Sequence, residues 1–189
     1  MMSHRAVSRL ASPAGLALLW LVCGAMAGRA GTQAPLETQV KAAYLFKFPS
    51  YVDWPGMAFP RPDMPFAIGV AGDERIALEL RRMTAGHTIG GRGIVVREVR
   101  EAAQCDSLQL LFVGRGDPAR AEAVIGWVRD RPCLVVTDGD RAPHGSMIHF
   151  VLTDGRVRFD ISQAAAADRG LALSARLLAV AHQVVVRNP

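Results

Sequence analysis

Three side chains that can bind ligands lie close together between positions 138 and 144. Asp138, Asp140 and His144 fall within the segment TDGDRAPHG, directly after an apolar run. Carboxylate and imidazole groups bind metal ions or polar ligands, and ligands gather at the carboxyl ends of strands in parallel sheets. The spacing matches no metal motif, so an ordinary polar loop is the competing interpretation. We expect a candidate ligand or partner loop here, and we predict no metal and no cofactor.

Two cysteines could form a disulfide. Cys105 and Cys133 each stand at or just before an apolar run typical of a strand, and one helical segment joins the two runs. A right-handed crossover would make these strands parallel and adjacent. Adjacent strands lie about 4.8 Å apart, and a disulfide needs Cα atoms about 4.4–6.8 Å apart. In an exported chain we expect a disulfide between the two, and two unpaired buried thiols are the alternative.

The chain shows no pattern of catalytic residues. Nucleophilic catalysis needs a serine or cysteine on a sharp turn beside a histidine and an acid, and no GxSxG sequence occurs. The stretch GHTIGGRG precedes a strand, so it presents no helix N-terminus to a phosphate group and is expected to be a turn. We predict no catalytic residues and no enzymatic activity.

The N-terminal residues predict export from the cytoplasm. Two arginines precede an uncharged apolar run that ends in Ala25-Met26-Ala27, and signal peptidase requires small residues at such positions. The dense apolar stretch from Gly15 to Val22 is short of the roughly 20 residues that span a bilayer. An uncleaved membrane anchor is the alternative. We expect a periplasmic protein with a signal peptide at 1–27, a linker at 28–35 and a single α/β domain at 36–189.

The net charge of +5 at pH 7 comes almost entirely from arginine. The arginines between positions 81 and 100 do not alternate with aromatic residues, and acidic residues intervene. A mildly basic, solvated surface therefore explains them better than a nucleic-acid site, and we predict no nucleic-acid partner.

Hydrophobic periodicity predicts an α/β fold. Apolar runs typical of buried strands occur at 66–72, 93–99, 108–114 and 133–139. Helical patterns follow the first and third runs, as in a parallel sheet covered by helices. Two alternating runs on either side of Asp154-Gly155 predict a hairpin. We expect a mixed, mostly parallel sheet of about six strands flanked by helices, with a C-terminal β-hairpin and a final helix over roughly 163–186.

The segment KAAYLFKFPSYVDWP, residues 41–55, is unusually aromatic. A helix expected from about Pro35 would place an apolar stripe against the core, formed by Leu36, Val40, Tyr44 and Phe48. Pro49 predicts a kink or a restart of the helix. Phe46 and Tyr51 lie off this stripe and are candidate exposed aromatics for partner binding.

Several motifs occur in the same order as in a known family. They are VKAAYLFKFPSYVDWP, FAIGVAGD, GRGIVVREV, CDSLQLLFVG, the run from CLVVTDG to VRFDIS, and GLALSARLLAVA. As an ordered set over residues 36 to 182, they resemble the YfiR family of periplasmic proteins.

The resemblance implies a regulatory function. YfiR-like proteins are periplasmic, and the best-known member holds an inner-membrane diguanylate cyclase inactive by binding its periplasmic sensor domain. An outer-membrane lipoprotein relieves that inhibition, and disulfides stabilise the repressor. The output is the level of cyclic-di-GMP and hence biofilm formation. Cys105 falls at the family's cysteine-led strand, whereas the pairing with Cys133 rests on the strand geometry above.

We therefore predict a periplasmic regulatory binding protein without catalytic activity, which represses such a cyclase. The alternative is a periplasmic small-ligand binding module that uses the loop at 138–146, and an enzyme of unknown type is a more distant one. The oligomeric state stays open, with a homodimer as one form.

Overall fold

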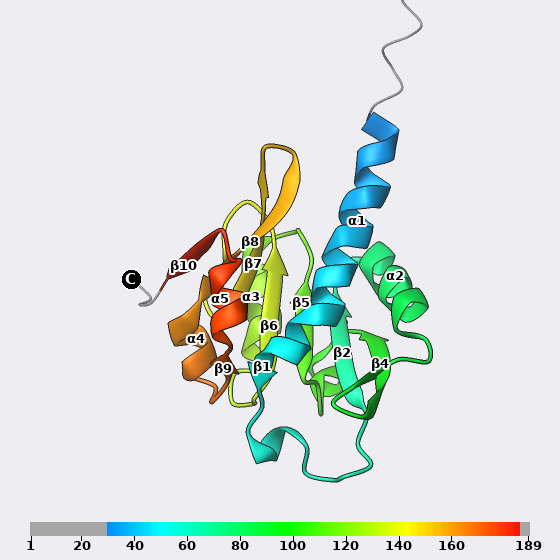
Figure 1. Ribbon diagram of the computed structural model, residues 1–189, viewed down its shortest axis with the longest axis vertical. Coiled ribbons are helices and arrows are strands. Elements are labelled where there is room, and N and C mark those ends of the chain that lie inside the picture. The colour runs from blue at the N-terminus through cyan, green and yellow to red at the C-terminus, as the bar shows by residue number, and fades with distance from the viewer. Residues whose placement is uncertain (1–29, 186–189) are drawn as a thin grey trace, which may run out of the picture. The chain divides into compact units, whose positions relative to one another are not determined.

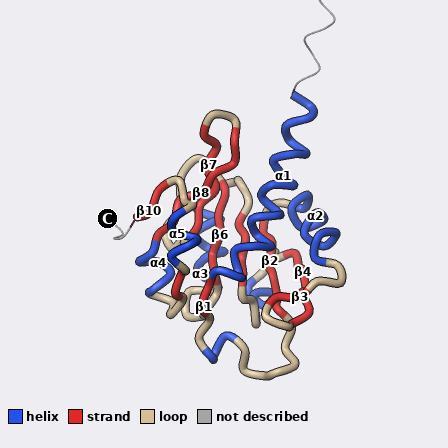
Figure 2. Tube along the Cα trace, viewed as in Figure 1, coloured by secondary structure: helices blue, strands red, loops and turns tan. Residues whose placement is uncertain are grey.

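The computed structural model describes residues 30–185, with side chains from Leu36 onwards. The expected signal peptide at 1–27 lies outside the described residues. In the described part, helices and strands alternate along the chain (Figures 1 and 2).

An eight-stranded sheet forms the centre of the fold, in the order β10-β8-β7-β6-β5-β2-β4-β3. β2 is parallel to both β4 and β5, β6 is parallel to β5 and β7, and β7 is antiparallel to β8. The mixed, mostly parallel sheet is thus confirmed, and the edge strands β3 and β10 extend it beyond the expected strands. The strands are β2 (Phe66–Ala71), β3 (Thr88–Ile89), β4 (Arg92–Glu98), β5 (Leu110–Val113), β6 (Leu134–Asp138), β7 (Ile148–Thr153), β8 (Arg156–Ser162) and β10 (Gln183–Val185).

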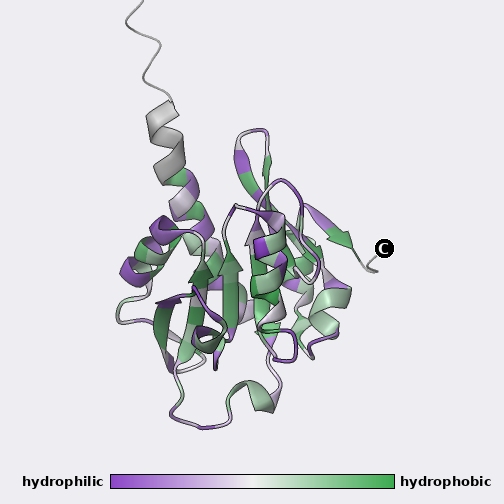
Figure 3. Ribbon diagram, turned by 180° about the vertical axis from the view of Figure 1, so that it is seen from behind, coloured by the Kyte–Doolittle hydropathy of each residue, from purple (hydrophilic) through white to green (hydrophobic). Residues whose placement is uncertain are grey.

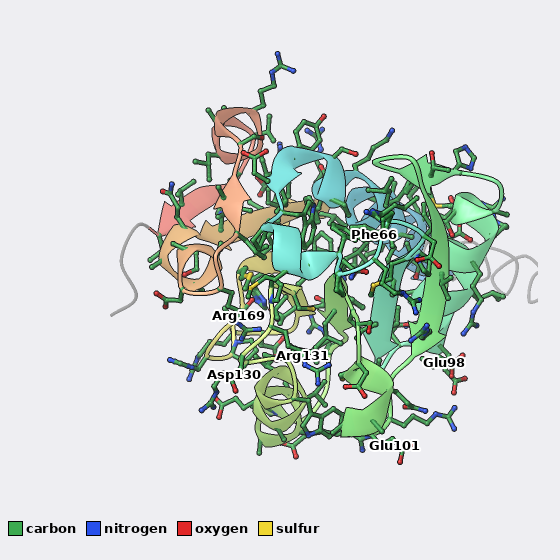
Figure 4. The ribbon with its side chains drawn as sticks, turned by 90° about the horizontal axis from the view of Figure 1, so that it is seen from below. Phe66, Glu98, Glu101, Asp130, Arg131 and Arg169 are labelled. Atoms are coloured by element: carbon green, nitrogen blue, oxygen red, sulfur yellow. The ribbon has the colours of Figure 1, made fainter. Side chains whose placement is uncertain are left out.

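Helices cover both faces of the central strands. β2 and β5 are buried at every residue, which explains their continuous apolar sequences. Figure 3 shows this apolar centre, and Figure 4 shows α3 on the opposite face from α1. The helices that follow β2 and β5 are α2 (Glu74–Thr84) and α3 (Pro118–Gly126), capped by Asp73 and Asp117, and a short 3₁₀ helix, η4 (Ala102–Cys105), precedes β5.

Two tight turns follow directly from the sequence. The predicted hairpin is formed by β7 and β8, with Asp154 and Gly155 at positive φ angles of 50° and 69°. Gly90 and Gly91, at 56° and 76°, make a second such turn between β3 and β4. Positive φ at both central residues is what a two-residue hairpin requires, so the glycine-rich stretch is a turn as expected.

The C-terminal third differs from the single helix expected over 163–186. It contains α4 (Gln163–Ala167), β9 (Ala172–Leu173), α5 (Ala175–Ala179) and β10. Gly170 adopts a φ of +69°, which a continuing right-handed helix cannot contain, and Ser174 caps a new helix. β9 pairs with β1 (Val52–Asp53). The two strands are distant from each other in the sequence, so local periodicity does not predict this pairing.

The first helix, α1 (Ala30–Lys47), begins earlier than the expected Pro35. It passes into the 3₁₀ helix η2 (Phe48–Tyr51) at Pro49, as predicted, and a second one, η3 (Gly56–Ala58), follows β1. The expected apolar stripe is only partly correct, because Leu36 is 59% exposed while Phe48 is buried. The face of α1 that enters the core is formed by Lys41, Ala42 and Leu45.

Candidate binding surfaces

Asp138 ends β6 at the carboxyl edge of the sheet, and two cations of the same chain approach it. Lys41 Nζ of α1 lies 2.6 Å from one Asp138 carboxylate oxygen, and Arg115 lies 3.9 Å from the other. Lys41 also binds Glu37 one turn earlier on α1. The Lys41 side chain is 6% exposed and that of Asp138 is 9% exposed, so this ion pair attaches α1 to the sheet from within the core.

The other two residues of the expected loop site lie apart from each other. Asp140 is almost fully exposed, and its carboxylate accepts a hydrogen bond of 2.6 Å from Arg115 Nη1. Arg115 therefore connects Asp138 with Asp140. His144 instead lines a separate pocket of about 510 Å³, together with Arg129 and Arg169. The structure thus divides the loop into a paired carboxylate group and a histidine beside a mixed-charge pocket.

A buried hydrogen-bond network lies behind this loop. Thr137 Oγ1 is 2.7 Å from Ser146 Oγ and 2.8 Å from His149 Nδ1, and the Ser146 hydroxyl donates to the Ile148 carbonyl. Burial lowers the pKa of His149, and the charges of Asp138 and Asp160 oppose that shift. Thr137, Ser146 and His149 are each at most 6% exposed. We interpret the network as the internal support that fixes the strand ends.

The loops after β2 and β5 touch at the point where ligands often bind in α/β sheets, and a pocket of about 470 Å³ lies beside them. The order of the strands reverses at β2: β4 is added on one side of β2, and β5 on the other. Ligands commonly bind at such a point. The Gly114 amide donates to the Ala71 carbonyl at 2.8 Å. A Cβ atom at Gly114 would lie 3.0 Å from the Asp73 Cβ atom and 3.2 Å from the Gly72 carbonyl. The two loops are therefore in direct contact, and the pocket beside them is lined by Asp73, Glu98 and Arg120.

Cys105 and Cys133 are both fully buried; Cys105 ends η4 ahead of β5, and Cys133 directly precedes β6. β5 and β6 are parallel, with Leu110 opposite Leu134, as the cysteine argument required. Burial raises the pKa of the Cys133 thiol to about 12, Arg169 opposes this shift, and the neighbouring Cys105 adds to it. The structure describes both residues as thiols, so the disulfide stays a prediction. Figure 4 shows Arg131 and Arg169 on the α3 side of the sheet; Arg131 donates to the Cys105 carbonyl.

The two candidate aromatics have different environments. Tyr51 is 38% exposed at the end of η2. Phe46 is half-buried, because its ring packs edge-on against His87 at 5.6 Å and carries the Lys47 ammonium at 5.3 Å. Tyr51 is thus the more accessible of the two for contact with a partner.

An apolar pocket of about 540 Å³ lies between α1, η2, β8 and α5. Tyr44, Phe48 and Phe159 line it, and Lys47 and Arg176 are its charged lining residues. Sequence reasoning assigned Val40 and Tyr44 to the core; both line this pocket, and Tyr44 also packs against the core. The apolar residues of α1 extend around more of the helix surface than one sheet can cover. This excess was the signal in the sequence that could have revealed the pocket.

Comparison with known proteins supports one family. A family model described as YfiR/HmsC-like matches residues 38–182. A search of curated proteins found no match. Between residues 30 and 185, no helix has the length and apolar character needed to cross a membrane. Within the same residues, no cluster of three or more histidine, cysteine or acidic side chains could hold a metal ion.

Proposed function

The chain belongs to the YfiR/HmsC-like family, and from this premise we propose that it is a periplasmic repressor of an inner-membrane diguanylate cyclase. It acts by binding the periplasmic sensor domain of the cyclase, and it thereby lowers cyclic-di-GMP and biofilm formation. An outer-membrane lipoprotein relieves the repression. The observation that carries this proposal is the family match over residues 38–182, which spans the whole sheet except β10.

The internal pairing of polar groups supports a binding protein over an enzyme. Ser146 and His149, the residues closest in type to a catalytic pair, are separated by Thr137 and buried from substrate. A general base must reach the proton that it removes, and these groups reach only each other and the backbone. We propose that the chain has no catalytic activity and that Tyr51 and Phe46 contribute to the partner contact.

Deletion of the gene tests the regulatory proposal. We expect cyclic-di-GMP to rise in the deletion strain, because the cyclase is released, and to return when the complete gene is supplied. A gene lacking codons 1–27 should fail to restore the level, since its product stays in the cytoplasm. Unchanged cyclic-di-GMP in the deletion strain would contradict repression. Restoration by the truncated gene would contradict periplasmic action.

A pull-down identifies the partner directly. The tagged protein, crosslinked in the periplasm, should recover a membrane protein that carries a periplasmic sensor and a cyclase domain. The second candidate function, a small-ligand module, is favoured by the pocket of about 510 Å³ beside His144. Recovery of a bound soluble metabolite without any cyclase would support that alternative.

A further inference from the structure

The pocket between α1 and α5 has a rigid apolar floor. The rings of Phe48 and Phe159 lie 5.0 Å apart, and Tyr44 lies 5.3 Å from Phe159 and 5.6 Å from Phe48. Phe48, Phe159 and Leu177 are at most 3% exposed, so the surrounding core holds them in place. A floor of this kind is formed before any ligand arrives, and such preformed apolar sites commonly have volumes of about 300–1,000 Å³.

The rim of the pocket carries positive charge only. Lys47 at the end of α1 and Arg176 on α5 are both exposed, and neither forms an ion pair with any residue that the structure describes. Two other pockets differ, because acidic residues line them beside arginines, as Asp130 and Asp168 do beside Arg129 and Arg169. A third pocket has Arg81 in its lining without an acidic residue, but it lacks the aromatic floor. A ligand that matches this pocket therefore carries an anionic group next to an apolar one.

We propose that this pocket binds a fatty acid, with its acyl chain on the aromatic floor and its carboxylate between Lys47 and Arg176. A sugar or a nucleotide would bury hydroxyl or amide groups against carbon atoms, and a buried polar group without a hydrogen-bond partner is unfavourable. An acyl chain has no such groups, and each methylene that it buries strengthens binding. The carboxylate stays at the exposed rim, where it retains water and gains the two cations.

Val180 marks the outer edge of the same site. It lines the pocket directly after α5 and is 63% exposed, so the site is open to solvent on this side. An acyl chain on the floor would remove this side chain from water. This proposal goes beyond the regulatory function, and its test requires no cyclase.

Titration calorimetry on the full chain, expressed as encoded and purified from the periplasm, tests the proposal. The probe is sodium dodecanoate below its critical micelle concentration, with dodecanol as the uncharged chain and butyrate as the carboxylate alone. We expect saturable binding of one dodecanoate per chain, binding of dodecanol about tenfold weaker, and no measurable binding of butyrate. Absence of dodecanoate binding would overturn the proposal.

Two variants locate the binding on the purified protein. The double variant Lys47→Glu/Arg176→Glu should bind dodecanoate at least about tenfold more weakly and bind dodecanol unchanged. Val180→Asp should bind both dodecanoate and dodecanol more weakly, because it places a carboxylate beside the alkyl chain of the ligand. Arg156→Glu at the hairpin tip is the matched control for an exposed arginine outside the pocket, and it should bind as the parent does. Equal dodecanoate affinity in the parent and the double variant would overturn the assignment of the rim.

Discussion

Lys41 is a single residue on which the position of α1 depends. Its ammonium group bridges Glu37 and the buried Asp138, so the first helix and the end of β6 share one cation. Removing one member of a buried pair leaves the other charge uncompensated, which typically costs about 3–5 kcal/mol. Arg115 is 3.9 Å from Asp138 and carries an exposed side chain, so it compensates only in part.

We predict that Lys41→Met lowers the free energy of unfolding by about 3 kcal/mol, measured by urea denaturation. Lys47→Met is the matched control, because Lys47 is exposed near the end of the same helix; a change within about 0.5 kcal/mol is expected there. The double variant Lys41→Met/Asp138→Leu should recover part of the loss, since no charge is then left buried. If Lys41→Met and Lys47→Met lowered the free energy of unfolding equally, the ion pair would contribute nothing to stability.

At the scale of elements, two side chains attach the loop between β1 and β2 to the sheet: Gln109, which donates to the Ala58 carbonyl at 2.9 Å, and Arg92, which holds the second half of the loop. Arg92 on β4 donates through Nη1 to the carbonyls of Arg61, Pro62 and Met64, at 3.2, 2.7 and 2.8 Å. Its guanidinium also lies 4.3 Å from the centre of the Phe59 ring. Proline-rich loops lack amide donors of their own, so a side-chain donor from the edge of the sheet replaces them.

We predict that Arg92→Lys accelerates hydrogen exchange across residues 56–64, with little change elsewhere. Lysine keeps the charge but loses the planar group that stacks on Phe59 and reaches several carbonyls. Exchange measured by mass spectrometry reports this local opening, with Arg97→Lys on the same strand as the control. Uniform acceleration over the whole sheet would mean that Arg92 supports the core and not this loop.

Helices, strands and turns were predictable from the sequence where neighbouring residues alone determine them. The buried strands appear as unbroken apolar runs, and the Asp154-Gly155 turn follows from the φ angles that it requires. The region after Ser162 was not predictable, because its leucines recur at helical spacing while Gly170 and the β9–β1 pairing divide it. Asp138 was expected at a strand end. Its partner Lys41 lies 97 residues away, a contact that only the fold creates.

At the scale of the whole molecule, a bridge between Cys105 and Cys133 would connect the two halves of the sheet. The cysteines precede β5 and β6, the adjacent strands at its centre, and a bond would close a loop of 28 residues. In the chain-entropy model such a loop stabilises the folded state by about 3 kcal/mol. The reactive species is the thiolate, and burial raises the pKa of Cys133 to about 12. The bond must therefore form while the chain is still folding.

We predict that protein purified from the periplasm shows no alkylated cysteine when it is denatured and treated with iodoacetamide without reductant, as mass spectrometry will measure. The folded protein should also resist dithiothreitol at pH 8, because both sulfur atoms are fully buried, and should be reduced only in urea. Cys105→Ser is the control and should carry one alkylated thiol. Two labelled thiols in the parent protein would contradict the bridge. In that case the stability of the thiol form should fall between about pH 9 and 12, because the unfolded chain releases the Cys133 proton first.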